Sequence, residues 1–285
     1  MAGPKTYVGV SGKARQVKNI YVGVSGKARK VKKVYAGVSG KARLVYSSDW
    51  WCPNGISTSD VLAAYLFKGK SSDTEALKDV TGHGYNLTKV TENGHTPTLS
   101  SANGYYFDEV WGTLSGYLNN DSLNGKTIKC IIVRYSGLTR TERGFLIGAC
   151  GSNGKAQVYA ASGSYKNGEH YVNYGTPGFV TVWGGNNVGT IKYRNGTMTS
   201  GTLCCNLDSG VMYVNGSTSA ESLTTKAGVF TDGIDQKKTF GNAHSGMSDW
   251  NNGYHAGKYI QAAVFFSKEL TAAQQKEVYT ALNSM

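Results

Sequence analysis

The first 46 residues contain no aspartate or glutamate, although they hold 11 of the 30 lysines and arginines of this 285-residue chain. The remaining residues carry 19 basic and 18 acidic side chains, so the formal net charge of +12 comes almost entirely from the N-terminal segment. A nucleic-acid-binding domain usually gathers basic residues on its folded surface. The body of the chain therefore gives no electrostatic reason to expect nucleic acid as its partner.

Long apolar runs are also missing. A membrane-spanning helix needs about 18 or more apolar residues in succession, and the longest candidate is the stretch YIQAAVFF at Tyr259 to Phe266. The opening stretch MAGPKTYVGVSGKAR lacks the apolar core of a secretory signal peptide. We therefore expect a protein that is made in the cytoplasm without a signal peptide and is not inserted into a membrane.

Cysteine and histidine are scarce and show no metal-binding spacing. The five cysteines form no C-x-x-C pair, and the adjacent Cys204 and Cys205 would be strained as a disulfide. The five histidines form neither H-x-x-x-H nor H-E-x-x-H. We expect reduced thiols, no cofactor and no zinc site.

A basic phrase is present three times, with a period of 14 residues. It reads YVGVSGKAR at Tyr7 to Arg15 and at Tyr21 to Arg29, and YAGVSGKAR at Tyr35 to Arg43. Glycine at each interior position costs a helix about 1 kcal/mol. Short apolar runs interrupted by Ser-Gly instead predict one β-hairpin per repeat, because glycine supplies the positive φ of a tight turn.

Three short hairpins bury little apolar surface by themselves, so we expect this arm to need a partner. We favour an assembly element that adds strands to another protein or to sister chains. A solvated β-meander without a special function and a basic tail that binds nucleic acid are the alternatives. The expected attachment residues are Tyr7, Arg15, Tyr21, Arg29, Tyr35 and Arg43.

The repeats over Tyr7 to Tyr46 resemble the short YVGVxGKARKVKK repeats of structural proteins of phages and prophages of Gram-positive bacteria. This resemblance implies a virion protein that is made in the bacterial host cytoplasm and docks to another virion structural protein through its arm. It also implies a homo-oligomer, with a trimer as the favoured arrangement.

The body that follows shows short strand-like runs separated by turn signals. Three Asn-Gly pairs, at Asn124-Gly125, Asn195-Gly196 and Asn215-Gly216, predict type I′ hairpin turns. Two runs, Ile128 to Tyr135 and Ala262 to Phe266, are apolar at nearly every position and predict central strands.

The last stretch of the chain is predicted to form a helix. Thr271 and Gln274 form a T-x-x-Q capping box, and Val278, Ala281 and Leu282 recur on one apolar face. One short helix after many strands predicts a β-sandwich.

Three body segments are similar, in order, to laminin-G-like jelly rolls of the concanavalin A-like class. These segments are VLAAYLFKG with DVTGHGYNLT, GVMYVNGS, and GKYIQAAVFFSKELTAAQQKEVYTAL. The expected fold class is all-β, with an N-terminal β-hairpin repeat arm followed by a concanavalin A-like (laminin-G-like) jelly-roll sandwich and a short C-terminal helix. The expected domains are the arm at 1–47, a linker at 48–59 and the sandwich at 60–285.

Glycosidases of this fold class carry clustered carboxylates, in an E-x-D-x-x-E arrangement, that act as acid and nucleophile or base. This sequence has no such cluster, and it lacks the G-x-S-x-G and G-x-x-x-x-G-K-[ST] motifs. We interpret the groupings Asp73/Glu75/Asp79 and Asp108/Glu109 as solvated loop charges. A Ser/His/Asp triad from distant segments stays open, but we expect a protein that is not an enzyme.

The best ligand candidate is the segment MSDWNNGYH at Met247 to His255, because aromatic faces and polar side chains together suit sugars. Packing of these aromatic residues at a sandwich edge is the alternative interpretation. The resemblance also leaves a loop Ca²⁺ open, for which an ordinary turn is the favoured alternative. The carbohydrate-binding candidates are Asp249, Trp250, Asn251, Asn252, Tyr254 and His255, with Trp183 and Trp111 in second place.

The resemblance of the arm leads us to expect a fibre, tail-tip or head-decoration component of a phage or prophage-derived particle. The arm would anchor it in the virion, and the jelly roll would bind host cell-surface carbohydrate through weak sites made effective by repetition. The alternatives are a decoration or cement protein without glycan binding and a nucleic-acid-associated protein that uses the arm.

Overall fold

The described part of the chain is mostly β-strand. The computed structural model describes residues 7–10, 13–16, 20–24, 27–31, 33–38, 41–47, 52–53, 55–111, 116–123, 126–139, 144–150, 156–162, 166–167, 170–171, 177–182, 189–194, 196, 198–227, 237–241, 254–255 and 257–284.

The arm forms three separate two-stranded sheets. Their strands are β1 (Tyr7–Val10) with β2 (Lys13–Gln16), β3 (Tyr21–Val24) with β4 (Lys27–Lys30), and β5 (Lys33–Val38) with β6 (Lys41–Ser47). Each pair is antiparallel, and two residues of sequence separate its strands. These two residues, the Ser-Gly of each repeat, lie outside the described residues. The predicted hairpins are therefore confirmed.

The body contains two large antiparallel sheets, one of seven and one of eight strands. The first has the order β21-β20-β13-β25-β10-β9, with β7 also paired to β25, and the second has the order β22-β19-β18-β15-β14-β23-β12-β8. The strands of the first sheet are β7 (Val61–Leu66), β9 (Thr98–Ser100), β10 (Gly104–Phe107), β13 (Cys130–Ser136), β20 (Gly201–Asn206), β21 (Val211–Val214) and β25 (Lys258–Phe266). The strands of the second sheet are β8 (Thr88–Val90), β12 (Tyr117–Asn120), β14 (Gly144–Cys150), β15 (Ala156–Ser162), β18 (Pro177–Val182), β19 (Gly189–Arg194), β22 (Leu223–Ala227) and β23 (Lys237–Phe240).

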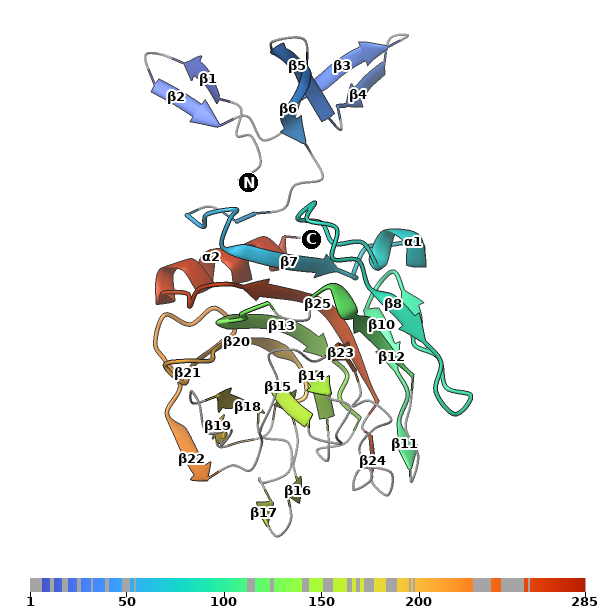
Figure 1. The fold of residues 1–285 in the computed structure, drawn as a ribbon, viewed down its shortest axis with the longest axis vertical. Coiled ribbons are helices and arrows are strands. Elements are labelled where there is room, and N and C mark those ends of the chain that lie inside the picture. Colours follow the sequence, from blue (N-terminus) through green and yellow to red (C-terminus); the bar gives the residue numbers. More distant parts are fainter. Residues whose placement is uncertain are drawn as a thin grey trace.

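Smaller elements complete the described structure. They are the helices α1 (Asp73–Ala76) and α2 (Ala272–Asn283), the 3-10 turn η1 (Asp121–Leu123), and the short strands β11 (Val110–Trp111), β16 (Lys166–Asn167), β17 (His170–Tyr171) and β24 (Tyr254–His255). Within the described residues, no helix is both long enough and apolar enough to cross a membrane. With its two sheets and its C-terminal helix, the body is the expected all-β jelly-roll sandwich (Figure 1).

The central strands of the first sheet are buried on both faces, which explains their continuous apolar sequence. Ile131 and Val133 of β13 point into the core between the sheets, whereas Cys130 and Ile132 point into a second core. The second core lies under α2, which contributes Val278 and Leu282, and Figure 1 shows α2 covering this side of the sheet. The predicted central positions of β13 and β25 are confirmed.

An aromatic cluster fills the space between the sheets. The ring of Phe240 meets those of Tyr65 and Phe265 edge-on, with centroids 5.4 and 5.7 Å apart. Such edge-to-face pairs contribute about 0.5–1.5 kcal/mol beyond the area that they bury. The second core begins earlier in the sequence than expected, because Ile56, within the predicted linker, is only 2% exposed.

The prediction that the three Asn-Gly pairs join the two strands of a hairpin is wrong, because the strands on either side of each pair belong to different sheets. Asn215 and Gly216 have the positive φ values of a type I′ turn, 51° and 71°. However, this turn leads from β21 of the first sheet to β22 of the second. Asn124, Gly125 and Asn195 lie outside the described residues, but the strands on either side of each of these two pairs belong to different sheets. A local turn signal cannot tell which sheet the next strand joins, because that is decided by distant partners.

A different Asn-Gly pair closes a two-residue turn. Asn93 and Gly94 have φ values of 49° and 81°, and the flanking Glu92 and His95 exchange both backbone hydrogen bonds, at 3.0 and 2.9 Å. Its flanking residues are polar rather than apolar, so the sequence around it does not carry the apolar pattern of a hairpin.

The C-terminal helix has the predicted cap. The Thr271 hydroxyl accepts a hydrogen bond from the Gln274 backbone N–H at 3.3 Å, and the Gln274 side chain accepts one from the Thr271 N–H at 3.1 Å. Val278 and Leu282 are buried as expected, and Ala281 is half-buried.

The described cysteines, Cys52, Cys130, Cys204 and Cys205, are free thiols. The sulfurs of Cys130 and Cys204 lie 3.6 Å apart in the second core. Burial raises the pKa of the Cys130 and Cys205 thiols well above its ordinary value. They are therefore packing residues rather than nucleophiles at neutral pH.

Candidate functional site

The register of the arm hairpins separates the predicted attachment residues into two sets. Opposed residues share a face of a β-ribbon, and neighbouring residues lie on opposite faces. Tyr7 is opposed to Gln16 and Arg15 to Val8, so the tyrosine and arginine positions belong to different faces of the first hairpin. The second and third hairpins repeat this division.

One valine of the arm is exposed. Val22, opposed to Arg29 in the second hairpin, is 50% exposed. Within the described residues, the arm strands pair only with each other and with no strand of the sandwich. The arm therefore keeps the outer edges of its strands, the usual place for strand addition by another chain.

The structure brings three of the predicted carbohydrate-binding residues together. The short strands β11 and β24 form an antiparallel ribbon in which Trp111 is opposed to Tyr254 and Val110 to His255. These positions are more than 140 residues apart in sequence, so their pairing could not be deduced from spacing. Trp183, Asp249, Trp250, Asn251 and Asn252 lie outside the described residues.

In the described part of the chain, no group of three or more histidine, cysteine, aspartate or glutamate side chains is placed to hold a metal ion. The loop residues considered for Ca²⁺ are among those that the structure does not describe.

A hollow of about 470 Å³ that sequence reasoning missed lies between the loop after β7, helix α1 and strands β8 and β9. This volume is in the range of small-molecule sites, roughly 300–1,000 Å³. Its lining residues are Lys70, Ser71, Ser72, Asp73, Lys89, Thr98, Leu99 and Ser101.

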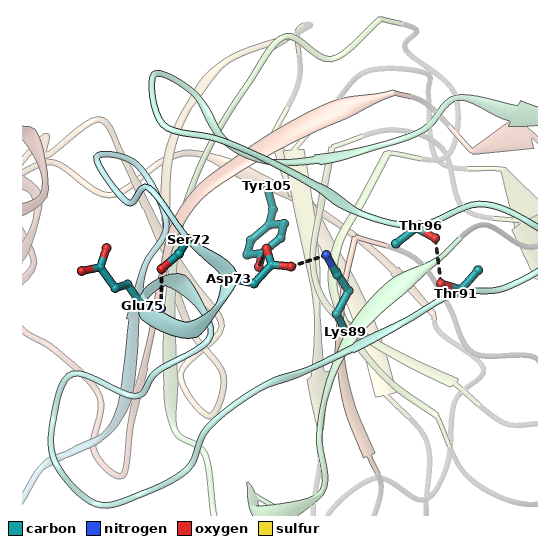
Figure 2. A network of polar contacts seen from close by, with 7 residues as sticks. All are labelled: Ser72, Asp73, Glu75, Lys89, Thr91, Thr96 and Tyr105. Carbon is teal, nitrogen blue, oxygen red and sulfur yellow. Dashed lines mark hydrogen bonds and ion pairs between the residues drawn. The ribbon is translucent and has the colours of Figure 1, made fainter.

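Asp73 is held in place from two sides of this hollow. It accepts a hydrogen bond from the Tyr105 hydroxyl at 2.7 Å, and the Lys89 ammonium forms an ion pair with its other oxygen (Figure 2). Partial burial acts to raise the pKa of Asp73, but the hydrogen bonds from Lys89 and Tyr105 outweigh it, so the pKa lies below its ordinary value. Burial, together with the hydrogen bond to Asp73, raises the pKa of Tyr105.

The wall formed by α1 is a capped single turn. Ser72 is its N-cap and accepts a hydrogen bond from the Glu75 backbone N–H at 3.4 Å (Figure 2). Ser71 donates a hydrogen bond to the Glu75 carboxylate at 3.3 Å. The S-x-x-E signature of Ser72 to Glu75 could have indicated this turn from the sequence.

The interpretation of Asp73, Glu75 and Asp79 as solvated loop charges is wrong for Asp79. This carboxylate is only 1% exposed, and it accepts hydrogen bonds from the backbone N–H groups of Ala64, Thr81 and Tyr85 and from the Thr81 hydroxyl. Asp79 therefore ties the segment after α1 to β7, and its role is structural. Glu75 is exposed, as expected.

Comparisons with known proteins do not assign a family. No protein-family model matches the sequence, and no curated protein matches it significantly. One similar solved structure concerns the entry of botulinum neurotoxin type C into cells through two ganglioside molecules; its identity is 12%, the match covers 79% of this chain and 52% of that chain, and the TM-score is 0.47. Another is domain 4 of AbnA, an extracellular arabinanase of Geobacillus stearothermophilus, with arabinotriose; its identity is 16%, the coverages are 78% and 98%, and the TM-score is 0.44. A third is the Trypanosoma rangeli sialidase with sialic acid; its identity is 10%, the coverages are 80% and 34%, and the TM-score is 0.48.

The chain spans about half the length of the botulinum neurotoxin chains to which it is similar, since it covers 52% of the type C chain. All of these TM-scores are below 0.5 and all identities are at or below 16%. Such likenesses assign neither a ligand nor an activity to this chain, and the sandwich fold is established by its own strand order.

Proposed function

We propose that the chain is a structural protein of a phage or prophage-derived particle, a fibre, tail-tip or head-decoration component. Its hairpin arm anchors it to another virion protein in a homo-oligomer, and its jelly roll binds carbohydrate on the host cell surface. The protein acts by binding and not by catalysis.

The observation that carries this proposal is the separation of the two modules. Figure 1 shows the three hairpins beyond β7 and α2, and the β11–β24 ribbon at the opposite end of the sandwich. An adhesin needs this arrangement, because the surface that meets the cell must point away from the part that is held in the particle. The opposed Trp111 and Tyr254 place two aromatic residues at that far end.

Adsorption to cells tests the ligand-binding half of the proposal. We expect the fluorescently labelled full chain to adsorb to Gram-positive host cells, and the double variant Trp111→Ala/Tyr254→Ala to lose most of this adsorption. Each aromatic residue that stacks on a sugar should contribute about 1 kcal/mol, and a multivalent oligomer amplifies the loss. Adsorption is measured by flow cytometry on cells with intact and with enzymatically stripped surface glycans.

Trp50→Ala is the matched control, because Trp50 precedes the sandwich in sequence and is not part of the ribbon. An oligomeric protein that binds no host cell or glycan array would point to a decoration or cement protein instead. Binding that survives glycan stripping would contradict carbohydrate as the receptor.

The nucleic-acid alternative has its own signature. Binding by the arm would show a steep loss of affinity with salt, of about one unit of log–log slope for each phosphate contacted. We expect no DNA binding by the full chain at physiological salt.

A further inference from the structure

Two contacts link the segments around the hollow beside α1. The backbone N–H of Gly69 donates to the Ser101 carbonyl at 2.7 Å, which joins the loop after β7 to the turn after β9. On the opposite side, the ion pair between Asp73 and Lys89 joins α1 to β8. These two links connect the segments on both sides of the hollow.

The charges around the hollow do not cancel. Lys89 is neutralised by Asp73, but within the described residues Lys70 has no carboxylate partner. The lining therefore keeps one net positive charge, located at Lys70. An anionic group in the ligand would supply the partner that this ammonium lacks.

Hydroxyl groups make up most of the remaining lining. Within the described residues, the Thr98 and Ser101 hydroxyls make no hydrogen bonds, so they are available to a ligand. Leu99, half-buried against the core, is the apolar contact. The lining contains no aromatic ring, so a ligand here is held by charge and hydrogen bonds rather than by stacking. This composition disfavours a neutral sugar and favours a charged, hydroxyl-rich one.

We propose that this hollow binds an anionic sugar unit. The Lys70 ammonium meets the carboxylate or phosphate of the sugar, and the Thr98 and Ser101 hydroxyls meet its ring hydroxyls. The inference rests on the proposed carbohydrate binding and deepens it, because it names a ligand class and a site separate from the β11–β24 ribbon.

Titration of the full chain with four small molecules tests this ligand class. The probes are glucuronate, glucose 6-phosphate, glucose and acetate, followed by isothermal calorimetry and by backbone amide shifts at Ser71, Thr98 and Ser101. We expect at least one of the two anionic sugars to bind with a dissociation constant of about 1 mM, as is typical of a single weak contact site. Which of the two binds more tightly distinguishes a carboxylate-bearing from a phosphate-bearing ligand. Glucose and acetate should each bind at least about tenfold more weakly.

Three outcomes would overturn the proposal. Equal binding of glucose would remove the role of charge, equal binding of acetate would remove the role of the ring hydroxyls, and no binding of either anionic sugar would remove the site.

Removal of the lysine charge tests the site itself. Lys70→Gln should weaken binding of the anionic sugar at least about tenfold, because it removes a charge-assisted hydrogen bond. Lys68→Gln is the matched control: it removes the same charge two positions away, where the side chain does not line the hollow. Equal effects of the two variants would show a general electrostatic attraction and contradict the assignment.

The two proposals fail separately. If Trp111→Ala/Tyr254→Ala abolishes adsorption to cells while glucuronate or glucose 6-phosphate still binds, the hollow is a site distinct from the ribbon, as proposed. If the full chain adsorbs to glycan-bearing cells but neither anionic sugar binds, the adhesin survives and the hollow is rejected.

Discussion

Lys258 is fully buried in the sandwich, where its ammonium lies 6.0 Å from the centre of the Phe107 ring. Burial lowers the pKa of this lysine from 10.5 to about 7, because the charged form loses its hydration. Between these two pH values the unfolded chain holds a proton on Lys258 that the folded chain has released. The free energy of unfolding should therefore rise with pH between about 7 and 10.5. Below about pH 7 both states are protonated, so the cost of burying the charged lysine is constant.

Lys258→Met should therefore stabilise the protein most at neutral and acidic pH. An apolar side chain of similar length removes a cost on the order of a few kcal/mol. The gap in melting temperature between variant and wild type should narrow as pH rises from 7 to 10. Lys276→Met, at an exposed position of α2, is the control and should show no such narrowing. Parallel curves for Lys258→Met and wild type would contradict the burial of an ionisable group at this site.

At the scale of the element, glycine is required where a turn meets another element. Gly216, in the turn after β21, has a φ of +71°, and a Cβ there would lie 2.3 Å from the Cδ1 atom of Tyr279 in α2. Gly94 has a similar φ of +81°, but nothing lies within 4 Å of the added atom. The pair separates the cost of backbone strain from the cost of a steric clash.

Gly94→Ala should cost about 1 kcal/mol of unfolding free energy, from the left-handed backbone alone. Gly216→Ala should cost about 2–3 kcal/mol more, because the Tyr279 ring or the whole helix must shift. Urea denaturation of both variants measures the difference. The variant Tyr279→Ala separates the two causes. If the clash is the cause, Tyr279→Ala should lower the free energy of unfolding less in the Gly216→Ala protein than it does in the wild type. Equal losses in the two single variants would show that α2 does not press on this turn.

The elements that could be predicted from the sequence are those whose structure is determined by residues close to them in the chain. The capping box of Thr271 and Gln274, the paired strands of each arm repeat and the apolar run of β13 are each specified by neighbouring residues. The elements that could not be predicted depend on distant partners. The turn at Asn215-Gly216 joins two sheets, and Asp73 meets Lys89 and Tyr105 only because α1, β8 and β10 converge (Figure 2). The ribbon that opposes Trp111 to Tyr254 is of the same kind.

At the scale of the whole molecule, the arm and the sandwich are separate folding problems. The residues of the two described cores begin at Cys52, and the three arm hairpins pair only with themselves among the described strands. An isolated two-stranded hairpin is marginal in water. The charge of the arm adds to this, since 11 basic residues without an acid repel one another. We therefore expect the hairpins to be stabilised by a partner, and we expect the sandwich to fold without the arm.

Removal of residues 1–47 should therefore leave the melting temperature of the sandwich unchanged within about 2 °C, since neither core loses a residue. If the arm is the assembly element that we propose, the same deletion should abolish self-association and incorporation into particles, because it removes the strand edges to which another chain would pair. Calorimetry measures the first effect, and gel filtration with light scattering measures the second. A fall of about 5 °C or more would mean that the arm packs on the sandwich. The same monomer before and after deletion would leave the arm without a role in self-association, and a shortened chain that still enters particles would place the anchor in the sandwich.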